Sequence, residues 1–241
     1  MNTLLIDGDI VAYRAATACE QPIDWGDGHW TLHAFEHEVE QNIDHFMENL
    51  IKDSKVKDWV TCLTGPKNFR KNVAASYKAN RNDKRKPMLL PHARAYLVNE
   101  WKGRIDENIE ADDTLGLLAT SGDGYMIWSI DKDLMTIPAY HFVDGEVKIV
   151  GEAEADYWFF YQTLVGDSTD NYKGCPNIGP KKAKGLLDDD CSWETVVKAF
   201  ENAGLSATVA LEQARLARIL RHGEYDFNTK EVSLWEPNAI Q

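Results

Sequence analysis

Three short apolar segments constrain the fold of this chain more than any other feature. They have the length and composition of buried strands, and they span residues 3–6, 59–63 and 125–130. Segments with helical periodicity lie between and after them, over residues 10–18, 32–51, 91–101, 109–119 and 156–165. Strands that alternate with helices are typical of α/β proteins. We therefore expect an α/β fold whose central, mainly parallel sheet is flanked by helices.

Two other segments have turn signals inside them. Residues 140–143 and 146–150 are separated by Asp144-Gly145, which predicts a β-hairpin. Residues 21–31 contain one proline and two glycines, and they are expected to form a loop, with or without a hairpin at its tip.

The carboxyl-terminal third is expected to be a small helical module. Helical patterns cover residues 193–203 and 207–221, and a short strand is expected after residue 231. We therefore divide the chain into an α/β region over residues 1–165 and a helical region over residues 166–241. A length of 241 residues suits one large core, or one core with a small module attached.

Composition excludes some classes of protein. No apolar stretch reaches the roughly 18–20 residues that a membrane span needs, and the amino terminus does not resemble a signal peptide. The four cysteines show neither C-x-x-C spacing nor a zinc-finger pattern, which favours reduced thiols. We expect a cytoplasmic protein that does not contact membranes.

The charged residues are unevenly distributed. The net charge is −13, which by itself argues against binding to nucleic acid. The segment from Lys67 to Arg104, however, contains eleven basic residues and only two acids. It therefore carries a charge of +9, and the rest of the chain carries −22. Such a distribution suits a protein that holds a polyanion with one part and cations with another. The alternative is that the basic run is only a solvated surface.

Eight acidic residues lie at junctions between predicted elements. Six of them, at the ends of predicted strands or in the helices that follow, are Asp7, Glu110, Asp112, Asp113, Asp131 and Asp133. In an open α/β sheet such positions converge on one crevice at the carboxyl edge. Asp167 and Asp170 follow a predicted helix. Carboxylates crowded together repel one another unless cations neutralise them, and oxygen donors favour Mg²⁺ or Mn²⁺ over zinc.

Each acidic motif also has a purely structural explanation. Acids in the first turn of a helix, such as those in residues 110–113, stabilise it by about 0.3–1 kcal/mol each through the helix dipole. Asp7 could cap the helix that follows it. Asp167 and Asp170 share one face if their segment is helical, and otherwise they belong to an acidic turn.

The order and content of these motifs are similar to those of the 5′-nuclease superfamily. This superfamily includes flap endonucleases, the 5′ nuclease domains of bacterial DNA polymerases, and the short phage-encoded 5′→3′ exonucleases, which this chain resembles most. The matching stretches are residues 7–9, 68–71, 77–81, 110–113, 129–134, 166–171, 174–179 and 217–235.

This resemblance implies a fold and a metal centre. The expected fold is a PIN-like nuclease domain with an arch at about residues 66–104, followed by a helix–three-turn–helix module that binds duplex DNA. Two Mg²⁺ or Mn²⁺ ions are expected, with K⁺ at the helix–three-turn–helix. The first metal site would be formed by Asp7, Glu110, Asp112 and Asp113 with Asp131 shared or nearby, and the second by Asp133, Asp167 and Asp170.

The resemblance also assigns residues to the substrate. Lys78 and Arg81 would act on the scissile phosphate from the arch. Residues expected to contact DNA are Tyr13, Arg70, Tyr77, Gly174, Ile178, Gly179, Lys181 and Lys182. Tyr13 could instead be an ordinary core aromatic, and the two lysines ordinary surface residues. The chain departs from the family at Gly65, where an aspartate is usual.

The expected function is that of a monomeric, metal-dependent 5′→3′ exodeoxyribonuclease acting on DNA with a 5′ end, flap or gap. Flap endonuclease or RNase H-like activity on related substrates, RNA–DNA hybrids among them, is expected as well. One alternative is a structure-selective DNA-binding protein that lost turnover through Gly65.

A second alternative is a phosphatase of the haloacid dehalogenase type with Asp7 as nucleophile. The spacing Asp7-x-Asp9 and the later pair Asp167 and Asp170 faintly resemble its motifs. Against it, Asp167 follows a predicted helix instead of a strand, and residues 110–113 would have no function in such an enzyme.

Overall fold

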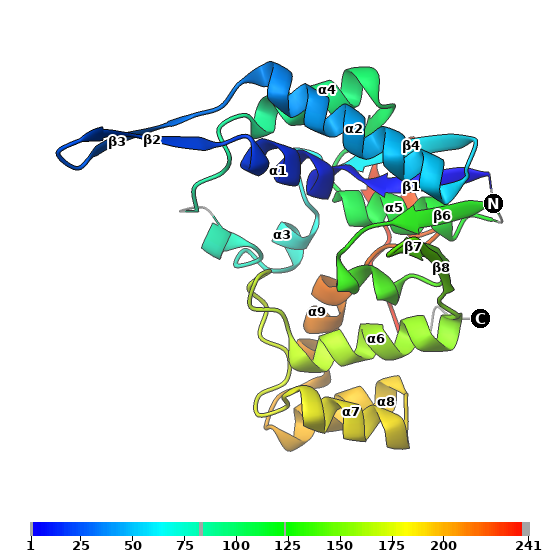
Figure 1. Ribbon diagram of the computed structural model, residues 1–241. Coiled ribbons are helices and arrows are strands. Elements are labelled where there is room, and N and C mark those ends of the chain that lie inside the picture. The colour runs from blue at the N-terminus through cyan, green and yellow to red at the C-terminus, as the bar shows by residue number, and fades with distance from the viewer. Residues whose placement is uncertain (1, 82–83, 123, 238–241) are drawn as a thin grey trace.

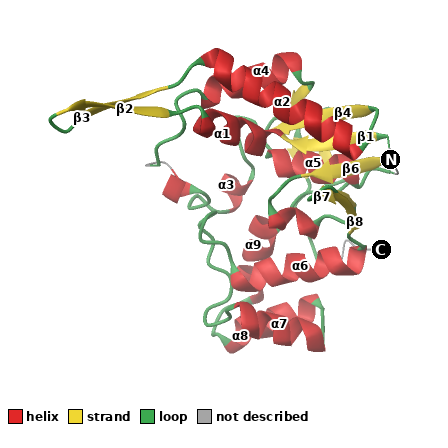
Figure 2. Cartoon of the chain, in the orientation of Figure 1, coloured by secondary structure: helices red, strands yellow, loops and turns green. Residues whose placement is uncertain are grey.

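A six-stranded sheet forms the centre of the protein (Figures 1 and 2). The computed structural model describes residues 2–81, 84–122 and 124–237. The strands are β1 (Thr3–Asp7), β4 (Asp58–Leu63), β5 (Gly103–Ile105), β6 (Tyr125–Trp128), β7 (Tyr140–Val143) and β8 (Glu146–Ile149). Their order is β5-β4-β1-β6-β7-β8, and every neighbouring pair is parallel except β7–β8. The predicted α/β fold with a mainly parallel sheet is therefore confirmed.

Helices cover both faces of this sheet. Because successive side chains of a strand point to opposite faces, Leu4 and Ile6 of β1 pack on one side and Leu5 packs on the other. Helices α1 (Gly8–Ala18), α2 (Glu36–Ser54) and α4 (Leu90–Glu100) cover the first face. Helix α5 (Ala111–Ala119) and the short 3₁₀ helix η2 (Lys132–Thr136) cover the second.

The segment between α1 and α2 is more regular than expected. The predicted loop over residues 21–31 is a two-stranded antiparallel ribbon, formed by β2 (Gln21–Gly26) and β3 (His29–His33). Figure 1 shows this ribbon projecting away from the rest of the molecule. Trp25 and Trp30 are each 65% exposed, and the Trp25 indole donates a hydrogen bond to Thr31 Oγ1 (2.8 Å). The β-forming residues of the segment pair with each other, and the glycines form the turn.

Four helices follow the sheet and form a second apolar cluster. They are α6 (Glu152–Val165), α7 (Pro180–Asp189), α8 (Trp193–Asn202) and α9 (Ala207–Ala217). The tail adds the short strands β9 (Tyr225–Asp226) and β10 (Glu231–Val232), and Trp235 packs on Phe159 of α6. None of the helices in the described parts of the chain is long and apolar enough to cross a membrane.

Helix α9 ends earlier than predicted. The periodic pattern extends to residue 221, but the helix stops at Ala217, and Arg218 has an extended backbone. The carbonyls of Leu216 and Arg218 accept hydrogen bonds from the Arg70 side chain. The Arg218 amide still donates to the Ala214 carbonyl (2.8 Å), and beyond it these distant contacts take the place of the helix.

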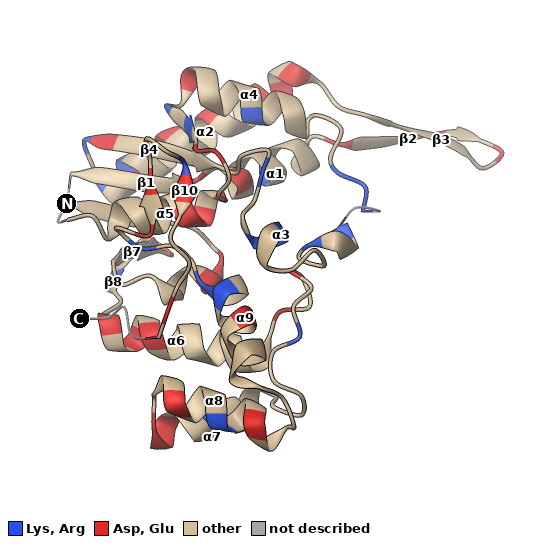
Figure 3. Ribbon diagram, turned by 180° about the vertical axis from the view of Figure 1, so that it is seen from behind, with Lys and Arg blue, Asp and Glu red and all other residues tan. Residues whose placement is uncertain are grey.

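Between β4 and α4 the chain contains little regular structure. It forms a one-turn helix α3 (Arg70–Val73) and a 3₁₀ turn η1 (Ala79–Arg81), within the segment predicted to be an arch. Residues 82–83 of that segment lie outside the described residues. Figure 3 shows basic residues recurring along this segment, whereas the β2–β3 ribbon has acidic residues and no basic ones.

Candidate active site

The first group of acidic side chains lies where β1 and β6 end. Asp7 is the last residue of β1 and the N-cap of α1, and it is only 3% exposed. Its carboxylate accepts hydrogen bonds from the Ile10 amide (3.2 Å) and the Ser129 hydroxyl (2.8 Å). Ser129 Oγ in turn accepts one from the Asp131 amide (3.0 Å). Ser129 therefore connects Asp7 to Asp131, although the sequence had given it no role beyond its place in a matching motif.

Shifted pKa values show which carboxylates of this group influence one another. Burial raises the pKa of Asp7 to about 6, with a smaller contribution from the charge of Asp131. Burial, followed by the charges of Asp7 and Glu110, raises the pKa of Asp112 well above its ordinary value. Asp7, Glu110, Asp112 and Asp131 therefore form one electrostatic group, which we call the first acidic group.

The second acidic group consists of Asp133, Asp167 and Asp170. Asp133 lies beside Asp131, because its amide donates a hydrogen bond to Asp131 Oδ1 (2.9 Å). Burial, then the charges of Asp131 and Asp167, raise the pKa of Asp133 to about 7, and Asp170 adds a smaller contribution. The two groups are thus contiguous through Asp131 and Asp133.

Asp167 and Asp170 lie in a closed turn and not in a helix. The Asp167 amide donates to the Tyr172 carbonyl (2.9 Å), and the Tyr172 amide donates back to the Asp167 carbonyl (3.0 Å). At the ends of the turn, a Cβ added to Gly166 or to Gly174 would collide with the other glycine's backbone. Only two glycines allow this approach, so we correct the helical alternative for the segment.

The base of the predicted arch is hydrogen-bonded to this turn. The Lys78 amide donates to the Asp170 carbonyl (2.8 Å), and Asn80 Nδ2 donates to the Ser168 carbonyl (2.8 Å). The Arg81 guanidinium pairs with the Asp170 carboxylate. Lys78 and Arg81, the predicted catalytic cations, are thereby held beside the second acidic group.

Lys78 links the two acidic groups. Its ammonium pairs with Glu110 of the first group and lies 3.4 Å from Asp170 Oδ2 of the second. Burial alone would raise the pKa of Glu110, but the cations of Lys78 and Arg70 lower it to about 2.

Tyr77 does not fit the DNA-binding role predicted for it. It is 3% exposed, and its hydroxyl lies 2.9 Å from Glu110 Oε2 and 2.8 Å from Asp170 Oδ2. A residue buried between two carboxylates is unable to reach DNA. Tyr77 instead connects Glu110 to Asp170 beside Lys78.

Arg70 and Asp113 also differ from their predicted roles. Arg70 is 2% exposed and Asp113 is fully buried, and they form a two-pronged ion pair at 2.7 Å. Arg70 is therefore unable to contact DNA. Asp113 lies within the same helical turn as Asp112, but both of its oxygens are engaged by protein donors.

The residues predicted to bind duplex DNA divide by exposure. Gly179 is exposed and caps the amino terminus of α7, and Lys181 and Lys182 are exposed in the first turn of that helix. Ile178 is half-buried, whereas Gly174 is buried and its amide donates to Gln213 Oε1 (2.9 Å). We correct Gly174 to a packing residue. Tyr13, near the amino terminus on α1, is 50% exposed.

Gly65 follows β4, at the position where an aspartate was expected from the resemblance. A Cβ added to Gly65 would lie 2.5 Å from the Asp106 carbonyl oxygen, and the Gly65 amide donates to the Ile109 carbonyl (3.4 Å). The backbone of residues 106–109 thus fills the space that a side chain would need. The first acidic group is formed without a carboxylate from this turn.

Arg94 was not recognised from the sequence. Its guanidinium pairs with Asp9 and donates to the Thr64 carbonyl (2.5 Å). The Asp9 carboxylate also accepts a hydrogen bond from the Thr64 amide (3.0 Å). Arg94 therefore joins the turn after β1 to the turn after β4.

The donor chemistry of the acidic groups fits a hard divalent cation. All the donors are carboxylate oxygens, and the raised pKa values of Asp7, Asp112 and Asp133 show buried acids with too little positive charge beside them. As placed, no three Asp, Glu, His or Cys side chains in the described ranges form a group able to hold an ion. Lys78, paired with Glu110, and Arg81, paired with Asp170, bind oxygens that such an ion would use.

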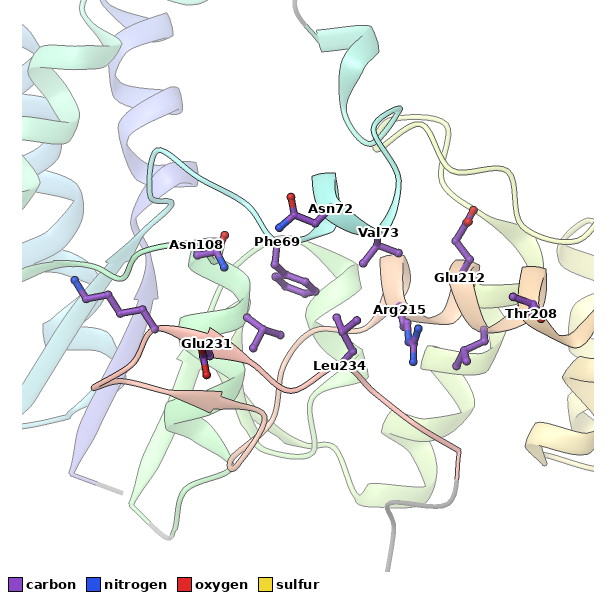
Figure 4. A pocket seen from close by; sticks show the side chains of 12 residues that line it. Phe69, Asn72, Val73, Asn108, Thr208, Glu212, Arg215, Glu231 and Leu234 are labelled. Atoms are coloured by element: carbon purple, nitrogen blue, oxygen red, sulfur yellow. The ribbon is translucent and has the colours of Figure 1, made fainter.

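A cavity of about 580 Å³ lies away from these carboxylates (Figure 4). Phe69 and Val73, at the base of the arch, face Leu234 of the tail across it, and Arg215 of α9 lies beside Leu234. None of the predicted metal ligands lines this cavity. The candidate active site is therefore the edge of the sheet, where the two acidic groups meet.

Comparison with known proteins identifies the family of this chain. Residues 2–157 match the family described as 5′-3′ exonuclease, N-terminal resolvase-like domain. The match covers well over half of the chain, so the chain belongs to this family of 5′-3′ exonucleases. The predicted resemblance to the 5′-nuclease superfamily is confirmed.

Two phage enzymes are similar over nearly the full length. The exodeoxyribonuclease of Enterobacteria phage T3 is 27% identical, with 98% of this chain and 93% of the relative covered. The exonuclease of Escherichia phage T7 is 28% identical, with coverage of 97% and 93%. The chain is thus close to phage exonucleases in sequence.

Solved structures share the fold. A phage T5 5′-exonuclease with bound zinc ions has a TM-score of 0.67 at 15% identity, with 90% of this chain and 89% of that chain covered. A phage T5 flap endonuclease in complex with DNA and metal ions has a TM-score of 0.64, also at 15% identity and with the same coverage. At such identities the likeness establishes the fold alone.

Proposed function

We propose that this chain is a divalent-metal-dependent 5′→3′ exodeoxyribonuclease, with flap endonuclease or RNase H-like activity on related substrates. The observation that carries the proposal is the meeting of two acidic groups at the carboxyl edge of the sheet, with Lys78 between them. The names of the phage T3 and T7 relatives support the reaction. The phage T5 structures with metal ions and DNA support the cofactor and the substrate.

Two Mg²⁺ or Mn²⁺ ions are the proposed cofactors. Asp7, Glu110 and Asp112 would hold the first, with Asp131 beside it. Asp133, Asp167 and Asp170 would hold the second. When bound, such ions activate water and stabilise the leaving oxygen of a phosphodiester. We leave Asp113 out of this ligand set because its oxygens are engaged elsewhere.

The protein's own groups position the substrate. Ser129 keeps Asp7 oriented by its hydrogen bond to the carboxylate. Lys78 and Arg81, once released from Glu110 and Asp170, would donate hydrogen bonds to the non-bridging oxygens of the scissile phosphate. Donors placed where negative charge develops lower the barrier of such a reaction.

The carboxyl-terminal region is the part of the chain that we propose binds duplex DNA. We take residues 1–165 as the nuclease domain, with an arch at about 66–104, and residues 166–241 as a helix–three-turn–helix module with K⁺. The exposed start of α7, with Gly179, Lys181 and Lys182, supports this assignment, since free amides at a helix amino terminus bind phosphate. The exposed Tyr13 ring would stack on a terminal base, and the enzyme would act as a monomer.

A duplex and a 5′-flap substrate, each labelled at the 5′ end, test this proposal. With Mg²⁺ we expect short labelled products, and with Ca²⁺ or excess chelator we expect none. Asp112→Asn should abolish cleavage, while Asp144→Asn, an exposed acid in the β7–β8 turn, should not. Retarded but intact DNA in Mg²⁺ would instead identify a binding protein. Cleavage that persists in chelator, or in Asp112→Asn, would overturn the mechanism.

A further inference from the structure

The carboxylate of Asp113 has no free position for a metal ion. Its Oδ2 accepts hydrogen bonds from Arg70 Nη1 (2.7 Å) and from the Glu110 amide (3.0 Å). Its Oδ1 accepts them from Arg70 Nη2 (2.7 Å) and from the Leu220 amide (3.1 Å). A carboxylate offers about four lone-pair positions, and four protein donors take them.

All three nitrogens of its partner, Arg70, also donate hydrogen bonds. Its Nε donates to the Leu216 carbonyl (3.0 Å), and Nη2 also donates to the Arg218 carbonyl. Its guanidinium lies over the Phe69 ring, with 4.6 Å between the guanidinium carbon and the ring centroid. Every nitrogen of the side chain therefore contacts Asp113 or the backbone at the end of α9 and just after it.

Three distant segments meet at this ion pair. Arg70 begins α3 at the base of the arch, Asp113 belongs to the first turn of α5, and residues 216–220 comprise the end of α9 and the chain just after it. The chain after α9 packs tightly on α5, since a Cβ on Gly116 would collide with the Leu220 carbonyl. The amide of Glu110, a member of the first acidic group, is bonded to Asp113 directly.

We propose that Asp113 is a positioning residue and not a metal ligand. Through Arg70 it fixes the turn that carries Glu110 and Asp112 against the base of the arch and against residues 216–220. The carboxyl-terminal helices are thereby joined to the catalytic edge of the sheet by one buried ion pair. This inference rests on the proposed function, because it concerns how the same cleft is assembled.

The test compares Asp113→Asn, Arg70→Gln and the double variant with Asp112→Asn in the full chain. Calorimetric titration with Mn²⁺ and the thermal unfolding midpoint are measured alongside cleavage of the labelled duplex. Asp113→Asn should lower the unfolding midpoint by roughly 10 °C, because the buried Arg70 keeps only the longer ion pair with Glu110 (3.4 Å), while Mn²⁺ affinity stays within about threefold of the parent. Asp112→Asn should weaken Mn²⁺ binding at least about tenfold without such a loss of stability.

If Asp113→Asn does not fold, the double variant shows whether Asp113 is a positioning residue or a metal ligand. It leaves no unpaired buried charge, so its unfolding midpoint should exceed that of Asp113→Asn, and its loss of turnover should be no greater than the larger of the two single losses. A tenfold loss of Mn²⁺ affinity in Asp113→Asn or in the double variant would overturn the proposal. If the parent chain does not cleave DNA, the proposed function fails, and the Mn²⁺ and unfolding measurements still decide the role of Asp113.

Discussion

Asp133 shows what a single carboxylate contributes in this cleft. Its pKa is about 7 in the folded chain against an ordinary value of 3.8, chiefly because it is buried beside other acids. Its favourable contribution to stability is therefore complete below about pH 4 and is lost as the pH rises through about 7. At neutral pH and above, the folded state holds a charge that the unfolded chain would hold more easily.

Asp133→Asn is therefore expected to stabilise the protein at pH 8. The gain in free energy of unfolding should be on the order of 1–2 kcal/mol at pH 8 and close to zero near pH 4, and cleavage should be lost. Urea unfolding at several pH values measures the difference, with Asp144→Asn as the exposed control. Equal stability of variant and parent at pH 8 would contradict the raised pKa of Asp133.

Lys78 is the residue at which metal binding and turnover should separate. Its ammonium neutralises Glu110 and lies near Asp170, so it competes with any cation for the same oxygens. Lys78→Met should bind Mn²⁺ several-fold more tightly and cleave DNA at least about tenfold more slowly. Lys71→Met, an exposed lysine of the same basic segment, serves as the control. Weaker Mn²⁺ binding in Lys78→Met would show that the lysine does not occupy the cation position.

At the scale of elements, the β2–β3 ribbon contributes little to the packed core. Both of its tryptophans are 65% exposed, and its cross-strand contacts are with itself. Phe159 of α6, by contrast, is 1% exposed and packs against Trp235.

Substitutions in the two elements should therefore differ sharply in cost. Trp25→Ser and Trp30→Ser should each change the free energy of unfolding by no more than about 0.5 kcal/mol. Phe159→Ala should cost about 3–5 kcal/mol, because it leaves a cavity in the carboxyl-terminal cluster. Denaturant unfolding of the three variants makes the comparison. A loss above 2 kcal/mol in either tryptophan variant would indicate that the ribbon packs on the core.

Local pattern predicted the sheet, most helices and the acidic motifs, because strand alternation and helical periodicity are properties of neighbouring residues. The predictions that failed concern residues whose positions depend on contacts with distant parts of the chain. Arg70 bonds Leu216, 146 positions away, and Tyr77 bonds Asp170, 93 positions away. The family resemblance assigned Arg70 and Tyr77 to DNA contacts, and nothing near either residue in the sequence signals burial. The end of α9 was misplaced for the same reason.

For the whole molecule, the separation of charge governs how it would meet DNA. The segment from Lys67 to Arg104 carries +9, although the chain as a whole carries −13. If the chain binds DNA as proposed, we expect the attraction to come from restricted surfaces, namely this basic segment and the start of α7 with Lys181 and Lys182.

The salt dependence of DNA binding should report those contacts. Lys181→Ala with Lys182→Ala should reduce the slope of log affinity against log salt by about 2, roughly 0.9 for each lost phosphate contact. Affinity is measured in Ca²⁺ at several salt concentrations, with Lys198→Ala of α8 as the control. An unchanged slope would place the duplex elsewhere on the molecule.

The closed turn between Gly166 and Gly174 carries Asp167 and Asp170 of the second acidic group, and the arch base is hydrogen-bonded to the same turn. The two parts should consequently travel as a single rigid body. A strand end that lifts the arch on entering would also alter the spacing of Asp167 and Asp170 relative to Asp7 and Asp112. Substrate entry and the change in spacing of the carboxylates would then occur in a single conformational change.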